Sequence, residues 1–176
     1  MKDKVTPVVI GLVLLALLLG LRQPGGRTES PQAGEEAPNF TFELNGQKRE
    51  LRDLRGQVVL VNFWATWCPP CVTEIPSLER LHRRLGSKGL VILAVSVDEN
   101  PVEYENFLRS NNITFATVRD PEKRISTQYG TFKYPESYVI DRQGRLVRKM
   151  IGALEWDEPD TLDFLTRVLE QNAPAR

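Results

Sequence analysis

The sequence predicts an α/β fold, in which a mixed β-sheet carries helices on both faces. Two apolar runs, residues 57–63 and 90–97, have the composition of buried strands, and the segment between them repeats apolar residues at helical spacing. This strand–helix–strand order favours parallel pairing of the two strands. Residues 136–151 have the pattern of two strands joined by a tight turn, which adds antiparallel pairing and makes the sheet mixed.

The boundaries of the elements follow from local signals. In chain order we expect a hairpin over residues 39–44 and 47–51, a strand over 57–63, a helix over 69–85, a strand over 90–97, a helix over 101–110, a short strand over 115–118, a brief helix over 120–129, a hairpin over 136–141 and 145–151, and a last helix capped at 157. Asn45-Gly46 is a preferred two-residue hairpin turn. Proline is tolerated in the first turn of a helix, as at Pro69 and Pro101. Asn100 is a good capping residue for the second of these helices.

The first 34 residues differ in composition from the rest. The chain has 176 residues, which suggests one domain, residues 35–176, with an N-terminal appendage. Residues 5–21 are uncharged and apolar, and as a helix they would extend roughly 26 Å, near the lower limit for spanning a membrane. We expect residues 1–22 to be an uncleaved signal anchor and the Gly-, Pro- and Ser-rich residues 23–34 to be a flexible linker.

A cleaved signal peptide is the alternative for this segment. It would need a shorter apolar core and a small-x-small cleavage site, and residues 19–22 offer no good site. The positive charges on the two sides are nearly balanced, with Lys2 and Lys4 before the apolar run and Arg22 and Arg27 after it, so they do not settle orientation.

The overall charge is also balanced. Lys and Arg together number 23, as do Asp and Glu, so the formal net charge is zero. No long-range field therefore attracts a polyanion, and we expect no nucleic acid partner.

The candidate chemistry is in the only two cysteines, Cys68 and Cys71. They follow the central strand and begin the predicted helix, where unpaired backbone N–H groups and the helix dipole favour a thiolate. Disulfide exchange needs a thiolate with access to its partner. We therefore assign Cys68 as the attacking thiol and Cys71, one turn inside the helix, as the resolving thiol.

Two other uses of a Cys-x-x-Cys pair are less compatible with the sequence. A structural zinc site needs four ligands, and the only histidine, His82, leaves the set incomplete, so we expect no metal. A purely structural disulfide remains the second alternative.

The motif Trp67-Cys68-Pro69-Pro70-Cys71, with Pro76 five residues further on, resembles the thioredoxin fold. Residues 63–67 and Glu74 resemble its membrane-anchored branch of TlpA, ResA and CcmG (DsbE) proteins. The resemblance covers roughly residues 35–172. It implies a thioredoxin-like fold with an N-terminal β-hairpin and a central helix–strand insertion.

The resemblance also implies a proton-transfer role for Glu74. At the position of a buried Asp in thioredoxin this chain has Asn62, which cannot take up a proton, and the branch often pairs that Asn with a Glu early in the helix. Glu74 lies one turn after Cys71, and a half-buried carboxylate there would have a raised pKa. A solvated helix carboxylate is the alternative.

The loop before residue 136 resembles the cis-proline loop of thioredoxin-fold proteins. There Pro135 would lie opposite the cysteines, with its neighbour's backbone pairing with a bound substrate strand. An ordinary strand-entry proline is the alternative. Tyr134 departs from the small or aliphatic residues common before that proline.

Further residues are expected around the cysteines. Trp67, Pro69, Pro70, Tyr134 and Pro135 form the expected substrate-binding set, Trp67 through its apolar ring or, alternatively, as core packing. Trp64 is expected in the core, and His82 on the solvent side of the helix. Asp98 and Glu99 follow the second strand at the end where the cysteines emerge, and they are expected in a solvated loop, with shaping of the groove as the alternative.

The resemblance implies a membrane-tethered thiol-disulfide oxidoreductase, monomeric and without a cofactor, that faces the periplasm or extracytoplasmic space. It would act mainly as a reductant on protein disulfides, with apocytochrome c as a candidate substrate and a transmembrane electron donor of the DsbD/CcdA type. The alternatives are a general disulfide oxidase or isomerase, a peroxiredoxin-like peroxidase, whose usual Pro-x-x-x-Thr-x-x-Cys loop is absent, and a non-catalytic binding module.

Overall fold

The computed structural model describes residues 30–171. The expected signal anchor, residues 1–22, and most of the expected linker lie outside the described residues. Within residues 30–171, no helix is both long enough and apolar enough to cross a membrane.

A five-stranded mixed sheet forms the centre of the domain, as the sequence predicts. Its strands, from one edge to the other, are β5 (Ala116–Arg119), β4 (Leu90–Ser96), β3 (Val58–Trp64), β6 (Glu136–Ile140) and β7 (Leu146–Ile151). The strands β3, β4 and β5 are parallel, whereas β6 and β7 run antiparallel to their neighbours. The central strand β3 is buried along its whole length, which explains its continuous apolar run.

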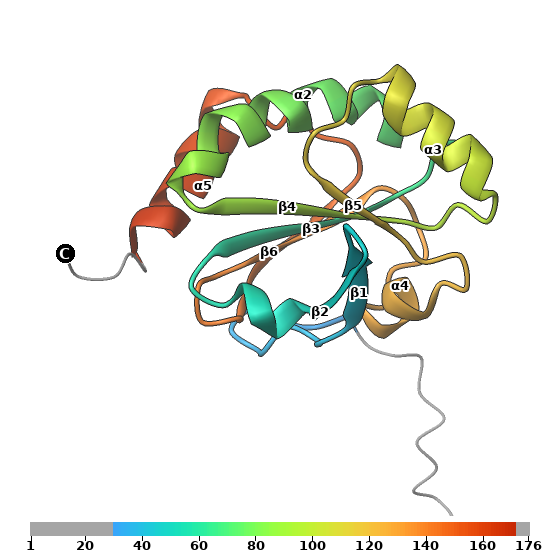
Figure 1. Cartoon of the computed structure of the whole chain (residues 1–176). Coiled ribbons are helices and arrows are strands. Elements are labelled where there is room, and N and C mark those ends of the chain that lie inside the picture. The colour runs from blue at the N-terminus through green and yellow to red at the C-terminus, as the bar shows by residue number, and fades with distance from the viewer. Residues whose placement is uncertain (1–29, 172–176) are drawn as a thin grey trace, which may run out of the picture.

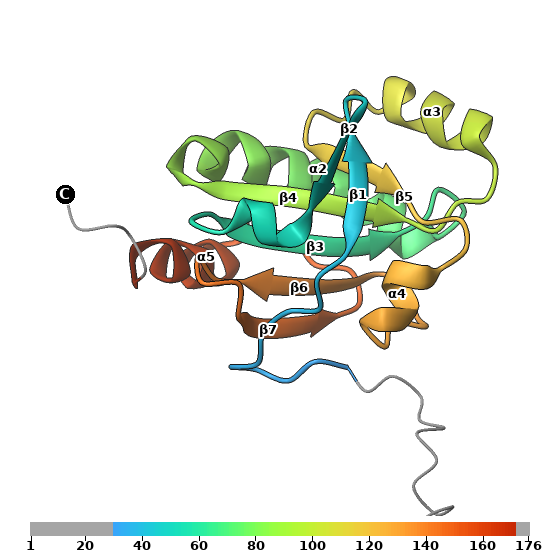
Figure 2. The same cartoon turned by 60° about the horizontal axis from the view of Figure 1, so that its bottom comes forward.

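Helices cover both faces of this sheet (Figure 1). The helices on one face are α2 (Pro69–Leu85), α3 (Pro101–Ser110) and α5 (Pro159–Gln171). The other face carries the hairpin β1 (Thr41–Leu44) and β2 (Gln47–Glu50), a 3-10 helix (Leu51–Leu54) and α4 (Arg124–Gln128). Figure 2 shows the hairpin crossing the strands of the central sheet, and it forms a separate two-stranded sheet. The expected hairpin and helix–strand insertion are therefore both present.

Two hydrophobic cores follow from alternation along β3. Val58 and Leu60 pack toward α2 and α5, whereas Val59, Val61 and Phe63 pack toward the hairpin and α4. Successive side chains of a strand point to opposite faces, so one apolar strand supplies both cores. The two cores fix β3 firmly, and its C-terminal end leads directly to the cysteines.

Two predicted helix starts are wrong. The helix α4 begins at Arg124 rather than near Asp120, because the Asp120 carboxylate accepts hydrogen bonds from the N–H groups of Arg124, Ile125 and Ser126 and so precedes the helix that it caps. The last helix begins at Pro159. Asp157 does not cap it, because its carboxylate accepts hydrogen bonds from the Arg80 side chain.

His82 also departs from expectation. It is partly buried, and its ring packs edge-on against Phe115, with ring centroids 6.4 Å apart. The helix therefore turns His82 toward the loop before β5 rather than to solvent.

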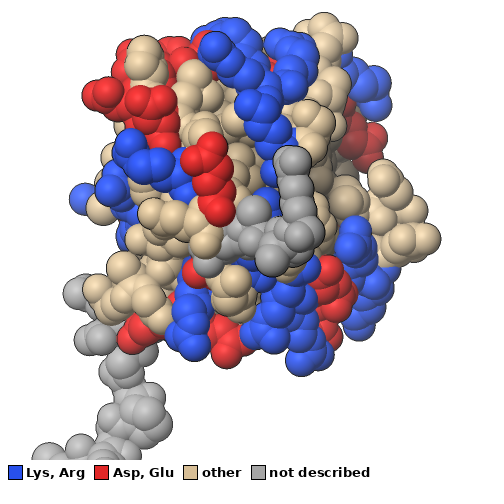
Figure 3. All heavy atoms as spheres, turned by 90° about the vertical axis from the view of Figure 1, so that its left-hand side faces the viewer, with Lys and Arg blue, Asp and Glu red and all other residues tan. Residues whose placement is uncertain are grey.

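Charged side chains of both signs share the surface. Figure 3 shows Lys and Arg interspersed with Asp and Glu on the face that lies at the left of Figure 1. On this face the charges do not form a large patch of one sign, consistent with the balanced composition.

Candidate active site

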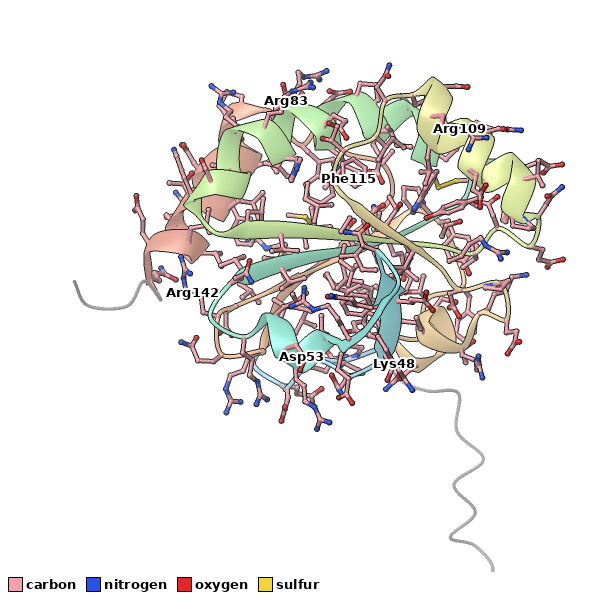
Figure 4. The ribbon with its side chains drawn as sticks, in the orientation of Figure 1. Lys48, Asp53, Arg83, Arg109, Phe115 and Arg142 are labelled. Carbon is pink, nitrogen blue, oxygen red and sulfur yellow. A yellow bond between two sulfur atoms is a disulfide. The ribbon has the colours of Figure 1, made fainter. Side chains whose placement is uncertain are left out.

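The end of β3 places the cysteines at the edge of the domain. After Trp64, three residues turn the chain, and Cys68 becomes the N-cap of α2, with its own N–H donating to the carbonyl of Ala65 at 3.2 Å. Cys68 and Cys71 form a disulfide with a Cα–Cα distance of 5.3 Å. Figure 4 draws this bond in yellow, on the side of the domain away from Arg142. Residue Cys68 is 5% exposed and Cys71 is fully buried, so only Cys68 offers any surface to a partner.

Two prolines restrict the hydrogen bonds available to Cys68. An N-cap side chain normally accepts from the N–H of the second or third helical residue. Pro69 and Pro70 occupy the first two positions and have no N–H, and both are exposed. The Cys68 sulfur therefore accepts only from the N–H of Cys71, at 3.4 Å.

The loop before β6 lies opposite the disulfide. The Tyr134–Pro135 peptide bond is cis, as the resemblance implies, and Pro135 is buried. The carbonyl oxygen of Tyr134 lies 3.6 Å from the Cys68 sulfur, although the two residues are 66 positions apart. The fold thus brings the Cys-x-x-Cys turn and the cis-proline loop together.

Aromatic rings lie beside this contact. Trp67 is 60% exposed, which rules out core packing, and its ring meets that of Tyr134 edge-to-face at 6.2 Å. The Tyr134 hydroxyl lies 3.4 Å from the Ser126 Oγ of α4. Phe132, in the same loop, is another exposed aromatic. Sequence reasoning missed it, although a Phe beside Lys133 in a turn region is a usable signal of an exposed ring.

Glu74 is buried behind the disulfide. It is 1% exposed, so the alternative of a solvated carboxylate is wrong. Its Oε1 accepts from Asn62 Nδ2 at 2.8 Å, and its Oε2 accepts from Trp156 Nε1 at 3.1 Å and from the N–H of Leu154 at 3.2 Å. Burial raises the pKa of Glu74, and the three donors oppose that shift without cancelling it.

Asn62 orients this carboxylate from the central strand. Its side-chain amide donates to Glu74 and to Ser137 Oγ on β6, at 2.8 and 2.9 Å. The other two donors, from Leu154 and Trp156, come from the segment between β7 and α5, which sequence reasoning did not connect with the site. The only available signal was a lone Trp between two acidic residues, Glu155 and Asp157.

Asp98 is the second buried carboxylate at this end of the sheet. The expectation of a solvated loop is wrong for it, because it is 2% exposed and accepts hydrogen bonds from Thr66 and Ser96. Glu99, its neighbour, is exposed and lies 3.4 Å from the ammonium of Lys123. Among residues 30–171, no three His, Cys, Asp or Glu side chains are grouped so that they could hold a metal ion.

Comparison with known proteins identifies the family. Residues 33–149 match the AhpC/TSA family. The thiol-disulfide oxidoreductase ResA of Bacillus thuringiensis (strain Al Hakam) is 39% identical over 125 residues, which cover 70% of this chain and 72% of that protein. ResA of Bacillus subtilis (strain 168) is 35% identical over 127 residues, covering 72% of this chain and 71% of its own length.

A solved structure agrees with these relatives. A putative thiol:disulfide interchange protein DsbE from Chlorobium tepidum superposes with a TM-score of 0.74 at 28% identity, covering 80% of this chain and 99% of its own. The fold, the disulfide and the sequence matches therefore agree. The chain belongs to the AhpC/TSA family and, within it, to the thioredoxin-fold thiol-disulfide oxidoreductases of the ResA and DsbE type.

Proposed function

We propose that this protein is a membrane-tethered, extracytoplasmic reductant of protein disulfides, and that apocytochrome c is among its substrates. The observation that carries the proposal is the Cys68–Cys71 disulfide at the start of α2, with Cys68 beside the cis-proline loop and Glu74 buried behind it. The reduced dithiol is the active form, and the disulfide is its product.

The reaction has two exchange steps. The Cys68 thiolate attacks one sulfur of a substrate disulfide, the substrate S–S bond breaks, and the departing substrate thiolate takes a proton from solvent. Cys71 then loses its proton and attacks the Cys68 sulfur, which closes the Cys68–Cys71 bond and releases the second substrate thiolate. Two electrons pass from the protein dithiol to the substrate disulfide.

Glu74 is the candidate base for the second step. Residues three apart on a helix lie on the same face, so Glu74 lies one turn from Cys71. A carboxylate with a raised pKa can accept a proton from a thiol more readily than an ordinary one. Asn62, Trp156 and Leu154 hold this carboxylate in place and themselves take no part in the proton transfer.

The two prolines favour a reductant over a strong oxidant. A strong oxidant of this class owes its potential to a stabilised reduced form, and so to a stabilised thiolate. Here the helix supplies the Cys68 sulfur with one N–H, that of Cys71. Weak stabilisation of the thiolate keeps the disulfide comparatively stable and the dithiol reducing.

Sequence supports the location and the substrate. The uncharged residues 5–21 are suited to anchoring the domain, and the ResA and DsbE relatives are named for thiol-disulfide exchange. We infer that the domain faces an oxidising compartment, where a transmembrane donor of the DsbD/CcdA type returns it to the dithiol state. The haem-binding cysteine pair of an apocytochrome c is the disulfide that such a reductant would open.

Reduction of insulin by the full-length protein tests the activity. We expect Cys68→Ser to abolish insulin reduction, and Cys71→Ser to accumulate the mixed disulfide, because its resolving thiol is missing. Insulin reduction at the wild-type rate by Cys68→Ser would contradict the proposal.

Two further measurements test location and substrate. The protein should remain in the membrane fraction after alkaline extraction, and a disulfide-closed Cys-x-x-Cys-His peptide should be reduced faster than the same peptide with one added residue between its cysteines. Release into the soluble fraction would contradict the tether, and equal rates would contradict the preference for apocytochrome c.

A further inference from the structure

Asp98 is fixed directly behind the turn that carries Cys68. Its carboxylate accepts hydrogen bonds from the Thr66 N–H, at 3.0 and 3.3 Å to the two oxygens, and from Thr66 Oγ1 at 2.7 Å. It also accepts from Ser96 Oγ, at the end of β4. Burying an ionised carboxylate costs free energy unless its oxygens are hydrogen-bonded, and here Thr66 and Ser96 supply these bonds.

The backbone of Asp98 is held as well. Its N–H donates to Ser96 Oγ at 3.0 Å, and its carbonyl oxygen accepts from Arg119 of β5 at 3.3 Å. None of the ion pairs among residues 30–171 involves the Asp98 carboxylate. The hydrogen-bond donors to the Asp98 carboxylate are therefore neutral groups, the N–H and hydroxyl of Thr66 and the hydroxyl of Ser96. Asp98, two residues after the end of β4, thus fixes the position of Thr66.

Thr66 lies two residues before Cys68, in the turn between β3 and α2. The N–H of Val97 donates to the carbonyl of Trp64 at 3.0 Å, so the turn is attached to the end of β4 at Trp64 and again at Thr66. Only Trp67 separates Thr66 from Cys68, and the Trp67 side chain is exposed. The position of the Cys68 sulfur therefore depends on the Thr66 attachment more than on packing of Trp67.

We propose that Asp98 and Thr66 act as a positioning pair for the attacking thiol. They hold the turn so that the Cys68 sulfur meets the N–H of Cys71, the single helix N–H within reach of it. Because Pro69 and Pro70 supply no second backbone donor, a small displacement of Cys68 removes the one hydrogen bond that the helix backbone gives its thiolate. The inference rests on the proposed role of Cys68 as the attacking thiol.

The chain contains a matched pair away from the disulfide. Glu79 of α2 is also a buried carboxylate, and it accepts hydrogen bonds from both the N–H and the Oγ1 of Thr114. Thr114 precedes Phe115, which Figure 4 shows between the sheet and α2. The same chemistry thus attaches a threonine at a place that does not carry Cys68, and it serves as a control.

The test compares Thr66→Val with Thr114→Val in the full-length, reduced protein. Both changes remove one hydroxyl donor and keep side-chain shape, and both leave the charged and titratable groups around the site, Glu74, Asp98, Tyr104 and Arg119, in place. The probe is iodoacetamide alkylation of Cys68 as a function of pH in a Cys71→Ser background, with urea unfolding of each variant measured alongside.

We expect Thr66→Val to raise the pKa of the Cys68 thiol by about 0.5 to 1 unit, and to slow alkylation below that pKa by about three- to tenfold, as the thiolate fraction falls. Thr66→Ser, which keeps the hydroxyl, should restore the wild-type profile. Thr114→Val should lower the urea midpoint to a similar extent and leave the Cys68 profile unchanged.

An unchanged Cys68 profile in Thr66→Val, or an equal change in Thr114→Val, would overturn the inference and leave the pair a structural contact only. If Thr66→Val does not fold, Ser96→Ala removes the other hydroxyl donor to Asp98 and should shift the profile in the same direction; an unshifted profile in folded Ser96→Ala would equally overturn it. Failure of the proposed function would be seen differently, as insulin reduction at the wild-type rate by Cys68→Ser.

Discussion

Glu74 and Glu79 lie five residues apart on the same helix, and both are almost fully buried. Glu79 accepts two hydrogen bonds from one residue, Thr114, and the guanidinium of Arg83 lies 3.8 Å away. Glu74 accepts three hydrogen bonds from two separate segments of the chain, one from Asn62 on β3 and two from Leu154 and Trp156 between β7 and α5, and none of these donors is a cation.

This difference assigns the two carboxylates different tasks. Burial raises the pKa of Glu74 above the ordinary carboxyl value, which makes it a better proton acceptor one turn from Cys71. Glu79 has a charged neighbour and a bidentate partner, and it attaches the segment before β5 to α2. Burial of a carboxylate therefore does not by itself indicate proton transfer, since the kind of partner decides.

The largest expected effect is a difference between Glu74 and Glu79 variants in the rate at which the mixed disulfide is resolved. Glu74→Gln should slow resolution of the mixed disulfide by about 100-fold at neutral pH, because an amide cannot accept the Cys71 proton. Glu79→Gln should leave this rate within about twofold. Rapid-quench analysis of the mixed disulfide measures both. The Asn62 side-chain amide can flip so that its oxygen accepts from the introduced glutamine, so the Glu74→Gln variant should stay folded. Equal rates in the two variants would show that Glu74 has no role in proton transfer that Glu79 lacks.

The second effect concerns the contribution of Glu79 to the free energy of unfolding. Glu79→Gln should lower the free energy of unfolding by about 1 kcal/mol, because two hydrogen bonds to a carboxylate are replaced by weaker neutral ones, with the Thr114 hydroxyl now accepting from the amide. Urea unfolding measures this change. Arg83→Ala is the control, since this side chain is 66% exposed and its contribution should stay below about 0.5 kcal/mol.

The third effect concerns pH. The pKa of Glu74 is raised on folding. At pH values between the ordinary Glu pKa, about 4.3, and the raised pKa, the folded state therefore keeps a proton on Glu74 that the unfolded state has lost. Wild-type stability should therefore fall as pH rises from about 4.3, by at most about 1.4 kcal/mol per pH unit from this group. At pH values above the raised pKa, Glu74 is ionised in both states, and its contribution to stability falls no further.

The Glu74→Gln variant isolates this contribution. Asp120 also has a pKa raised by burial and shifts stability in the same direction, so the informative quantity is the wild-type curve minus the Glu74→Gln curve. That difference should slope downward with rising pH. A flat difference from pH about 4 to 8 would show that Glu74 ionises normally.

The smallest effect concerns the thiolate rather than the carboxylates. Pro70→Ala restores an N–H at the second position of α2, which should add one hydrogen bond to the Cys68 thiolate. We expect the reduction potential to become less negative by about 20 to 30 mV, the equivalent of roughly 1 kcal/mol for a two-electron couple. Pro76→Ala, further along the helix, is the control and should leave the potential unchanged, whereas an equal shift would point to helix flexibility.

Features encoded locally could be predicted from the sequence. The apolar runs of β3 and β4 and the Asn45-Gly46 turn carry their structure in neighbouring residues. The position of the cysteines at the start of α2 follows from the same local pattern. The cis bond at Pro135 was implied by family resemblance rather than by any local preference.

Features that depend on tertiary contacts could not be predicted. Leu154 and Trp156 reach Glu74 from 80 and 82 residues further along the chain, and no periodicity relates them to it. Asp98 precedes Glu99 and Asn100 in a stretch typical of solvated loops, and only the adjacent end of β3 places it under Thr66. The start of α4 was misplaced for a similar reason, since the Asp120 carboxylate caps a helix four residues away.

The reduction potential of the Cys68/Cys71 pair tests the central claim most directly. The full-length protein is equilibrated in glutathione or dithiothreitol buffers of graded potential, and the fraction of dithiol is measured after thiol alkylation. A protein-disulfide reductant predicts a value near that of thioredoxin, about −270 mV. A value near −120 mV, in the range of strong oxidants, would contradict the account and make the protein a donor of disulfides.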